Sequence, residues 1–288
     1  MVKNLLKACC MIAALTAAGQ AAAETYTVGS GGTYRPFEFE NSQKQLEGFD
    51  IDIIKAIAKA EGFDVKLVNT PWEGIFATLN TGDRDIIKAI AKAEGFDVKL
   101  VNTPWEGIFA TLNTGDRDII ISGITITDKR KQMVDFSAPY FPAEQSIVVA
   151  QDSQVDSLAA LKNEKVGVVN SSTGDIVVSE VLGKNSTAIK RFDNTPLMLQ
   201  ELFEDGVSAA VGDVGVVKYY IKQHPEKQFK LVPDAKFERQ YFGIAVAKGN
   251  SELLGKINAG LQKIVADGTY AKIYKTWFDD NVPTLPAQ

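Results

Sequence analysis

The stretch Ile119-Ile-Ile-Ser-Gly-Ile-Thr-Ile-Thr-Asp-Lys-Arg130 runs from a short apolar strand into a glycine, alternating threonines and a cationic helix start. Gly123 has no Cβ and lets a ligand approach the backbone, while Thr125 offers a backbone N–H and a hydroxyl. The threonine and the aspartate before the lysine can each cap the following helix, whose positive end then faces the same point as Arg130. Arg130 supplies a planar fork that binds a carboxylate through two hydrogen bonds. The stretch predicts a carboxylate receptor; the alternative is a strand followed by a solvated Lys-Arg-Lys helix face.

Strands and helices alternate on both sides of this stretch. Thr25 to Gly29 and Val65 to Val68 read as strands, and between them Ile53, Ile54 and Ile57 recur at the spacing of an amphipathic helix. The pattern predicts an α/β fold with parallel strands and helices on both faces of each sheet. Further elements are expected at 146–150 (strand), 158–161 (helix), 166–169 (strand), 175–181 (helix), 197–203 (helix), 209–211 (strand), 241–246 (strand), 253–265 (helix) and 270–277 (helix).

One segment is repeated without change. Residues 52–87 are identical to residues 85–120, at an offset of 33 residues. A solenoid needs about three or more diverged repeats, and no third copy follows. We therefore interpret the repeat, units 52–84 and 85–117, as an in-frame 33-residue tandem duplication in the first half of the molecule.

The N-terminus is typical of a secretory signal peptide. Lys3 and Lys7 lie at the start of an apolar run from Leu5 to Ala18, and Ala21-Ala22-Ala23 follow it. Cleavage is expected near Ala23, with export to the periplasm. Both cysteines, Cys9 and Cys10, lie inside this segment, so the mature chain is expected to have no disulfide, cysteine metal site or other cofactor. Its removal takes the formal charge from −5 to −7, which disfavours nucleic acid as a partner.

Three other segments contain candidate ligand-binding residues, each with a structural alternative. Tyr34 follows two glycines after a strand and can present its ring to a ligand, or form a small aromatic core. The loop 170–174 can bind an anion at a helix N-terminus, or simply cap it. Asp213 can cap the next helix or pair with an ammonium group. His224 lies in a Gln-His-Pro-Glu loop and gives no basis for a catalytic base.

Eight motifs occur in one order along nearly the whole mature chain and together resemble the polar amino-acid-binding proteins of bacterial ABC importers, solute-binding protein family 3. They are GGTYRPFEF, EGFDIDIIKAIA, PWEGIFATLNTGDRDIIISGITITDKR, VDFSAPYF, VNSSTGD, VGD, QYFGIAVAKG and GTYAKIYKTWF. The resemblance implies a type II periplasmic-binding fold, in which two α/β lobes are joined by two crossing hinge strands and close on the ligand. Lobe one is then expected at 24–139 and 245–288, lobe two at 145–239, and the hinge at 140–144 and 240–244.

The resemblance also implies roles for individual residues. Arg130 would bind the α-carboxylate, Asp213 the α-ammonium, and Tyr34 would sandwich the ligand side chain with the tryptophan of the PWEG motif. Because copy two keeps the native downstream context, Trp105 is favoured for this role, with Trp72 as the alternative. Further ligand contacts are expected from Ser122, Gly123, Thr125, Thr173 and Gly174.

The side-chain end of the ligand stays unassigned at this stage. Relatives that bind basic amino acids or glutamine carry Asp where this chain has Gly31, and glutamine binders carry Lys and His where it has Asn170 and Gly212. Two aromatic rings suit a guanidinium or another flat polar group, which favours a polar or basic L-amino acid.

The expected function is therefore capture of an L-amino acid by a monomeric protein and delivery to the membrane permease of an ABC importer, without catalysis. Exported cyclohexadienyl dehydratases share this fold and provide the alternative. They need a general acid or base beside a ring-shaped substrate. A receptor's ligand-sensing domain is disfavoured because no second hydrophobic span follows the signal peptide.

Overall fold

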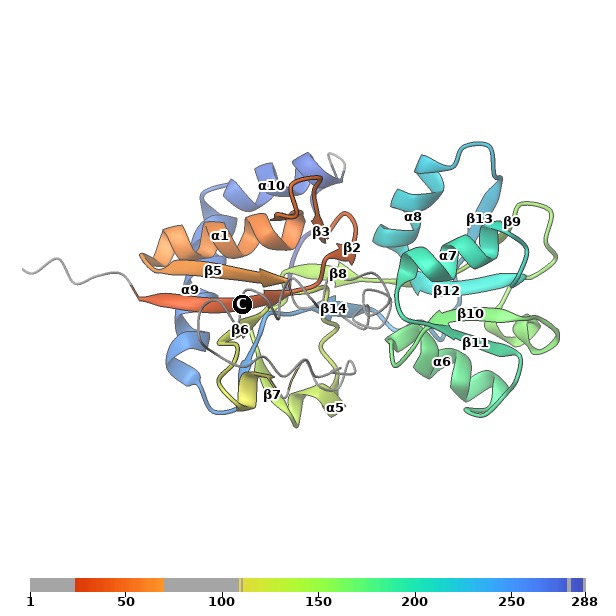
Figure 1. Cartoon of the computed structure of the whole chain (residues 1–288), viewed down its shortest axis with the longest axis horizontal. Helices are drawn as coiled ribbons and strands as arrows, with labels where there is room; N and C mark the ends of the chain where they lie inside the picture. The colour runs from red at the N-terminus through yellow and green to blue at the C-terminus, as the bar shows by residue number, and fades with distance from the viewer. Residues whose placement is uncertain (1–23, 70–108, 110, 279–280, 287–288) are drawn as a thin grey trace, which may run out of the picture.

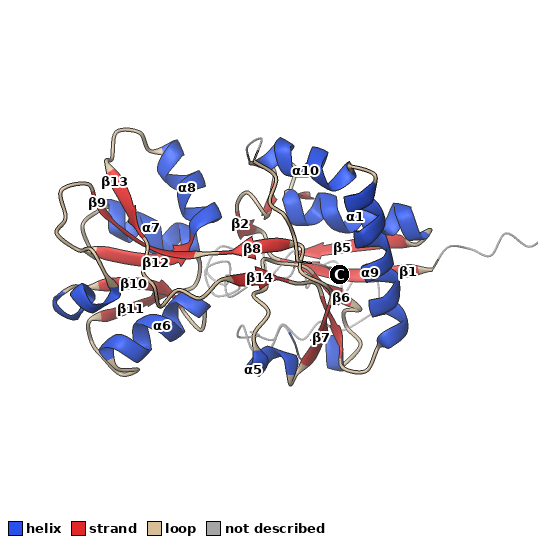
Figure 2. Cartoon of the chain, turned by 180° about the vertical axis from the view of Figure 1, so that it is seen from behind, coloured by secondary structure: helices blue, strands red, loops and turns tan. Residues whose placement is uncertain are grey.

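The computed structural model describes residues 24–69, 109, 111–278 and 281–286. It has two α/β halves side by side, each built on a five-stranded sheet (Figure 1). Two strands, β8 (Phe141–Ala143) and β14 (Gln240–Phe242), lie between the halves in both views and pair antiparallel (Figure 2). These strands fall within the segments 140–144 and 240–244 that were expected to cross; the lobe boundaries remain a prediction.

The first half is built on the sheet β5-β1-β6-β15-β7. Strand β1 pairs in parallel with β5 and β6, whereas β15 pairs antiparallel with β6 and β7. A small antiparallel sheet, β2-β3-β4, lies beside it. The strands are β1 (Thr25–Ser30), β2 (Thr33–Tyr34), β3 (Glu38–Glu40), β4 (Leu46–Glu47), β5 (Asp64–Asn69), β6 (Ile119–Ile120), β7 (Val134–Phe136) and β15 (Ala245–Ala247).

Helix α1 (Phe49–Glu61) provides much of the core of this half. Its isoleucines recur at helical spacing on one face, and the helix ends at Gly62, which has the left-handed φ of 73° that favours glycine. It packs against α9 (Ser251–Ala266), where a Cβ on Gly260 would lie 2.7 Å from Ile57 Cγ2. Gly260 therefore allows the two helices to approach closely. Helices α5 (Asp128–Lys131) and α10 (Thr269–Trp277) complete the half.

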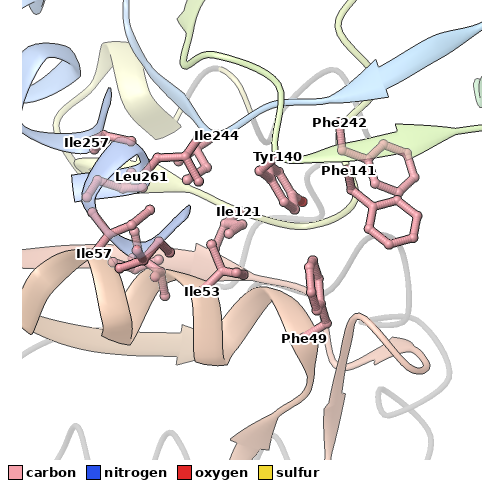
Figure 3. Packing of buried hydrophobic residues seen from close by; sticks show 14 of the residues in the cluster. Phe49, Ile53, Ile57, Ile121, Tyr140, Phe141, Phe242, Ile244, Ile257 and Leu261 are labelled. Atoms are coloured by element: carbon pink, nitrogen blue, oxygen red, sulfur yellow. The ribbon is translucent and has the colours of Figure 1, made fainter. Parts of the chain in front are cut away.

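Figure 3 shows how this core reaches the crossing strands. Ile53, Ile57 and Phe49 of α1 face Leu261 of α9 and Tyr140, and all five side chains are buried. The rings of Phe141 on β8 and Phe242 on β14 stack with centroids 5.8 Å apart. Burial of large apolar side chains thus ties the crossing strands to the first half.

The second half is built on the sheet β11-β10-β12-β9-β13. Strand β10 pairs in parallel with β11 and β12, and β9 pairs antiparallel with β12 and β13. Apolar side chains cover both faces of this sheet in two separate clusters. The elements are β9 (Gln145–Ala150), η1 (Leu158–Asn163), β10 (Val166–Val169), α6 (Thr173–Leu182), β11 (Ile189–Phe192), α7 (Thr195–Phe203), β12 (Ala209–Asp213), α8 (Val214–Gln223) and β13 (Phe229–Val232).

Two elements differ from the sequence-based expectation. The helix at 158–161 is a 3-10 helix, η1, and the strand expected over 241–246 is split into β14 and β15. At the break, a Cβ on Gly243 would lie 2.8 Å from the Ile126 side chain. Ile244 pairs with Ser137 instead of β8: its carbonyl accepts a hydrogen bond from the Ser137 N–H at 2.8 Å, and its N–H donates to Ser137 Oγ at 3.0 Å. The chain changes partners here because it leaves the crossing strands and joins the sheet of the first half.

The described residues of the duplicated segment come from both copies. Helix α1 and strand β5 are formed by copy one, while Phe109 and Leu112 of copy two pack beneath β6 with Ile120. Trp72, Trp105 and the expected signal peptide lie outside the described residues. Within the described part of the chain, no helix has the length and apolar character needed to cross a membrane.

Candidate ligand-binding site

A pocket enclosing about 670 Å³, open space included, lies where strands of both halves end. Gly31 follows β1, Ser122 follows β6, Val169 ends β10 and Asp213 ends β12. In α/β sheets ligands bind at the carboxyl ends of the strands, so the topology itself gathers these residues. The described lining residues are Gly31, Thr33, Tyr34, Glu38, Ser122, Gly123, Thr125, Arg130, Gln145, Val169, Ser172, Thr173, Asn194, Thr195, Val211, Gly212 and Asp213.

Arg130 brings a positive charge to the pocket from the first half. Thr127 caps α5 by accepting a hydrogen bond from the Arg130 backbone N–H at 3.2 Å, and Arg130 Nη1 donates to the Thr125 carbonyl at 2.9 Å. The side chain is held in place by its own loop and only 7% of the residue is exposed. Burial lowers the pKa of Arg130 to about 10, an effect that the nearby Asp213 charge opposes. The guanidinium stays charged at neutral pH and is positioned to bind an anionic group.

Asp213 brings the opposite charge from the second half. Its Oδ2 accepts a hydrogen bond from the Tyr34 hydroxyl, and its Oδ1 accepts one from Gln145 Nε2 at 2.6 Å. Asp213 precedes α8, but its side chain makes no capping hydrogen bond there. Burial raises the pKa of Asp213 to about 6, and the contacts with Tyr34, Arg130 and Gln145 oppose this rise. The carboxylate therefore does not cap α8, and Asp213 lines the pocket; its pairing with an ammonium group stays a prediction.

The wall between these charges is formed by the loop after β6. Ser122 Oγ accepts a hydrogen bond from the Gly31 N–H at 3.1 Å and donates to Glu38 Oε1 at 2.6 Å. Gly123 has a φ of 51°, and a Cβ there would lie 2.6 Å from Tyr34 Cε1. Its backbone N–H donates to Asp50 Oδ2 at 2.8 Å, so it is bound within the protein. The glycine is required both by its left-handed backbone and by the Tyr34 ring.

The loop 170–174 begins helix α6 at the opposite wall. Ser172 caps the helix by accepting a hydrogen bond from the Asp175 N–H at 3.1 Å, and Thr173 lines the pocket in the first turn. Gly174 does not line the pocket: a Cβ there would lie 3.0 Å from the Val211 carbonyl. Gly174 instead allows α6 to pack closely on β12.

The structure brings together most of the predicted site residues. Tyr34, Ser122, Gly123, Thr125, Arg130, Thr173 and Asp213 all line one pocket. Gly174 lies behind it, and the tryptophans Trp72 and Trp105 fall outside the described residues. His224 lies in an exposed loop, with Nδ1 3.1 Å from Glu226 Oε1, and is not among the pocket residues.

Three buried polar side chains at or beside the pocket escaped the sequence analysis, namely Glu38, Asp50 and Gln145. Asp50 had a usable signal, because it lies one turn before Ile53 and Ile54 on the apolar face of α1. Glu38 lies between two buried phenylalanines in a strand without alternation, and Gln145 begins a strand buried on both faces, so neither position stands out.

Glu38, which lines the pocket, and Asp50, which does not, form a buried pair of carboxyl groups. Asp50 Oδ2 accepts hydrogen bonds from Gly123 N at 2.8 Å and Tyr140 OH at 2.9 Å. Burial, followed by the Asp50 charge, raises the pKa of Glu38 well above its ordinary range. Burial also raises the pKa of Asp50 to about 6, although its two donors oppose the rise. Burial thus disfavours the charged form of both carboxyl groups.

The sequence of this chain matches the profile of a known protein family. Residues 26–87 and 83–280 match the sequence profile of the bacterial extracellular solute-binding proteins, family 3. The chain belongs to this family. The two matched segments overlap, and together they span the repeated unit and most of the chain.

Individual proteins are similar to this chain over most of its length. The chain is 36% identical over 256 residues to a probable histidine-binding protein of Neisseria gonorrhoeae, covering 88% of this chain and 83% of the relative. It superposes with a TM-score of 0.72 at 34% identity on the arginine-, lysine-, histidine-binding protein ArtJ of Geobacillus stearothermophilus, covering 88% and 95% of the two chains. An ancestral amino acid-binding protein that is a precursor of cyclohexadienyl dehydratase superposes with a TM-score of 0.69 at 34% identity, covering 88% of this chain and 95% of that chain. The predicted type II periplasmic-binding fold is thus confirmed.

Proposed function

We propose that this family member captures one polar or basic L-amino acid in the periplasm and delivers it to the permease of an ABC importer. The observation that carries the proposal is the pair Arg130 and Asp213, two opposite charges from different halves in one pocket. A zwitterion can satisfy both charges at once. The names of the histidine-, arginine- and lysine-binding relatives support an amino acid as that zwitterion.

The head group is held by complementary charges. Arg130 and Thr125 bind the α-carboxylate, and Thr173 approaches it from the second half. Asp213 binds the α-ammonium, with its oxygens already oriented by Tyr34 and Gln145. A preoriented acceptor loses little conformational entropy when the ligand arrives, which favours tight binding. Trp105, or Trp72 in its place, completes the side-chain contact with Tyr34 in this proposal.

Binding selects the closed arrangement of the two halves. Because contacts to the ligand come from both sides of the crossing strands, the full set is available only when the halves are together. The closed, ligand-bound monomer is then the form that the permease recognises. The expected signal peptide, cleaved near Ala23, brings the protein to the periplasm.

A dehydratase activity is the alternative that the fold leaves open, since one relative in structure is a precursor of such an enzyme. His224 lies outside the pocket, and Asp213 is paired with Tyr34, Gln145 and the proposed ligand ammonium. We therefore propose a binding protein without catalysis. Incubation with prephenate or arogenate should give no aromatic product, and turnover would contradict this assignment.

Calorimetry against the twenty common L-amino acids tests the proposal. Arg130→Ala and Asp213→Ala should each weaken binding by roughly 2–5 kcal/mol, because each leaves a desolvated charge without its partner. Matched controls lie on α5 itself: Lys131→Ala and Asp128→Ala remove an exposed ion pair and should bind like the wild type. Wild-type affinity in both pocket variants would disprove the assignment.

A further inference from the structure

We propose that Asp50, which lies outside the described pocket lining, is a positioning residue for ligand binding. Its buried carboxyl group fixes the Gly123 corner of the pocket before a ligand arrives. This inference rests on the proposed function and deepens it, because it concerns the same site. Asp50 acts through Gly123 and makes no contact of its own with the ligand.

Asp50 is an acid in an apolar environment. It lies in the first turn of α1 and, like Ile53 and Ile54 of the same helix, is 0% exposed. Burial of a carboxyl group costs free energy unless its oxygens accept hydrogen bonds. Its Oδ2 accepts two of them, from the Gly123 N–H at 2.8 Å and from the Tyr140 hydroxyl at 2.9 Å. The acid is therefore stabilised in the core by the two donors that it holds in place.

The Gly123 N–H lies where the chain leaves the sheet of the first half. Just before it, the Ile121 N–H donates to a β1 carbonyl at 3.1 Å, and just after it the Ile124 carbonyl accepts a hydrogen bond from the Gly243 N–H at 3.0 Å. Between these two anchors, Gly123 turns with a φ of 51° and its N–H donates to Asp50. A side chain thus supplies the acceptor at the one turn between two backbone pairings.

The position of this turn determines both ends of the head-group site. A Cβ on Gly123 would lie 2.6 Å from Tyr34 Cε1, and the Tyr34 hydroxyl donates to Asp213. Two residues after the turn, the Thr125 carbonyl accepts a hydrogen bond from Arg130 Nη1 at 2.9 Å. A shift of Gly123 would therefore disturb both charged groups. A turn that is fixed in advance reduces the entropy lost on binding.

The carboxyl group of Asp50 is itself held by a rigid part of the core. Tyr140 faces α1 from the core and precedes the crossing strand β8 (Figure 3). Its N–H donates to the Phe242 carbonyl at 3.0 Å, and its own carbonyl accepts a hydrogen bond from the Tyr270 hydroxyl at 2.8 Å. Because Tyr140 is anchored on both sides, its hydroxyl orients Asp50 toward Gly123.

Two substitutions of Asp50 separate the acceptor from the volume of the side chain. Asp50→Leu fills the space without an acceptor and should weaken binding at least about tenfold, because the Gly123 N–H loses its partner. Asp50→Asn keeps one side-chain oxygen that can accept from both donors, so its affinity should stay within about threefold of the wild type. Calorimetry with the best wild-type ligand among the twenty common L-amino acids provides the measurement.

Asp52→Leu is the matched control. Asp52 lies on the same helix, and its Oδ2 accepts a hydrogen bond from Trp277 Nε1 at 2.8 Å, outside the described pocket lining. The substitution therefore removes a comparable long-range hydrogen bond of α1 that does not reach the pocket. Its melting temperature can fall, but its ligand affinity should remain that of the wild type.

Amide hydrogen exchange of Gly123 provides a readout that a general loss of stability does not reproduce. In the ligand-free wild type and in Asp50→Asn this amide should be protected, and in Asp50→Leu it should exchange at least about tenfold faster than in the wild type. If Asp50→Leu does not fold, the affinity of Asp50→Asn and the exchange in the wild type decide the question.

Four results would overturn the inference: wild-type affinity in Asp50→Leu, a tenfold loss of affinity in Asp50→Asn, an equal loss in Asp52→Leu, or an unprotected Gly123 amide in the wild type. Failure of the wild type to bind any amino acid would instead disprove the proposed function.

Discussion

The hydroxyl of Tyr34 donates a hydrogen bond to Oδ2 of Asp213 and so connects the two halves of the molecule across the pocket. The two residues are 179 positions apart in the chain. Close by, a Cβ on Gly215 would lie 3.4 Å from the ring of Phe37, so the halves also touch through apolar atoms. The residue that orients the proposed ammonium acceptor thus belongs to the opposite half.

Tyr34→Phe should weaken amino-acid binding by roughly 1–3 kcal/mol, because Asp213 loses one of its two oriented donors. Calorimetry with the best wild-type ligand provides the measurement. Tyr26→Phe is the control, since its hydroxyl donates to the exposed Glu24 at 2.6 Å, far from the pocket residues. Equal affinities for Tyr34→Phe and the wild type would show that the contact with Asp213 contributes nothing to binding.

The free energy of unfolding of the ligand-free protein should fall as the pH rises from about 4 to about 7. Burial raises the pKa of Asp213 from 3.8 to about 6, so the folded state binds this proton more strongly than the unfolded chain. The resulting stability is complete below the unfolded pKa and is lost as the pH rises through the folded pKa. Asp50 contributes in the same direction and range, with a pKa of about 6.

Denaturant unfolding at several pH values measures this dependence. Asp213→Asn should flatten the profile by roughly 1–3 kcal/mol over this range, and Asp128→Asn, which is exposed, should leave it unchanged. Affinity for a neutral amino acid should change in the opposite direction and decrease below about pH 6, because the ammonium needs a charged Asp213. A wild-type profile that Asp213→Asn does not alter would contradict the assignment of the titrating group.

Gly123→Ala should abolish ligand binding and destabilise the protein. The new Cβ would lie 2.6 Å from Tyr34 Cε1, and the φ of 51° is unfavourable for alanine. Displacement of the Tyr34 ring would also break its hydrogen bond with Asp213. Gly255→Ala in α9 is the matched control, because no atom lies within 4 Å of its new Cβ and alanine favours the helix by about 0.5–1 kcal/mol. The melting temperature should therefore fall in Gly123→Ala and rise in Gly255→Ala, and calorimetry should show lost binding only in Gly123→Ala. Near-wild-type binding by Gly123→Ala would contradict the close approach of Gly123 to the Tyr34 ring.

Local patterns in the sequence were sufficient for much of the fold. The spacing of Ile53, Ile54 and Ile57 predicted α1, and the polar residues after β6 and at the end of β12 predicted where a ligand would bind. These features depend on near neighbours in the chain or on the general topology of parallel strands. The same reasoning applies to Arg130, whose hydrogen bonds with Thr127 and Thr125 join residues within five positions of each other.

The missed features depend on contacts between distant residues. Glu38 is identified only by its approach to Ser122, which is 84 positions away, and Gln145 only by its bond to Asp213, 68 positions away. Residue type alone also left Asp213 ambiguous between a helix cap and a pocket residue. The direction of its side chain is decided by Tyr34 in the other half, which no local pattern encodes.

A variant lacking residues 53–85 should bind the same ligand and be more stable than the full chain. The deletion joins Asp52 to Ile86 and restores one unit of identical sequence, so α1 and β5 keep every side chain. In the full chain, β5 and β6 flank the same strand β1, and their connection runs from residue 70 to residue 118. Removing 33 of these residues shortens the loop about threefold, which reduces the entropic cost of closure by about 1 kcal/mol. The full chain carries the isoleucines of α1 twice in its sequence, and the deletion leaves one set, which is fully buried in α1.

Tryptophan fluorescence tests which copy of the unit contributes to the pocket. Phe109 and Leu112, which follow Trp105 in copy two, are buried and pack with Ile120 of β6, whereas α1 and β5 come from copy one. We therefore expect the ligand to quench the emission of Trp105, so that Trp105→Phe loses the signal and Trp72→Phe retains it. Trp277 provides a constant background, because its indole donates to Asp52 at 2.8 Å and lies outside the pocket lining. If only Trp72→Phe loses the ligand signal, copy one occupies the pocket and the choice of Trp105 is wrong. For the deletion variant, a lower stability than that of the full chain would show that the surplus unit is an integral part of the fold.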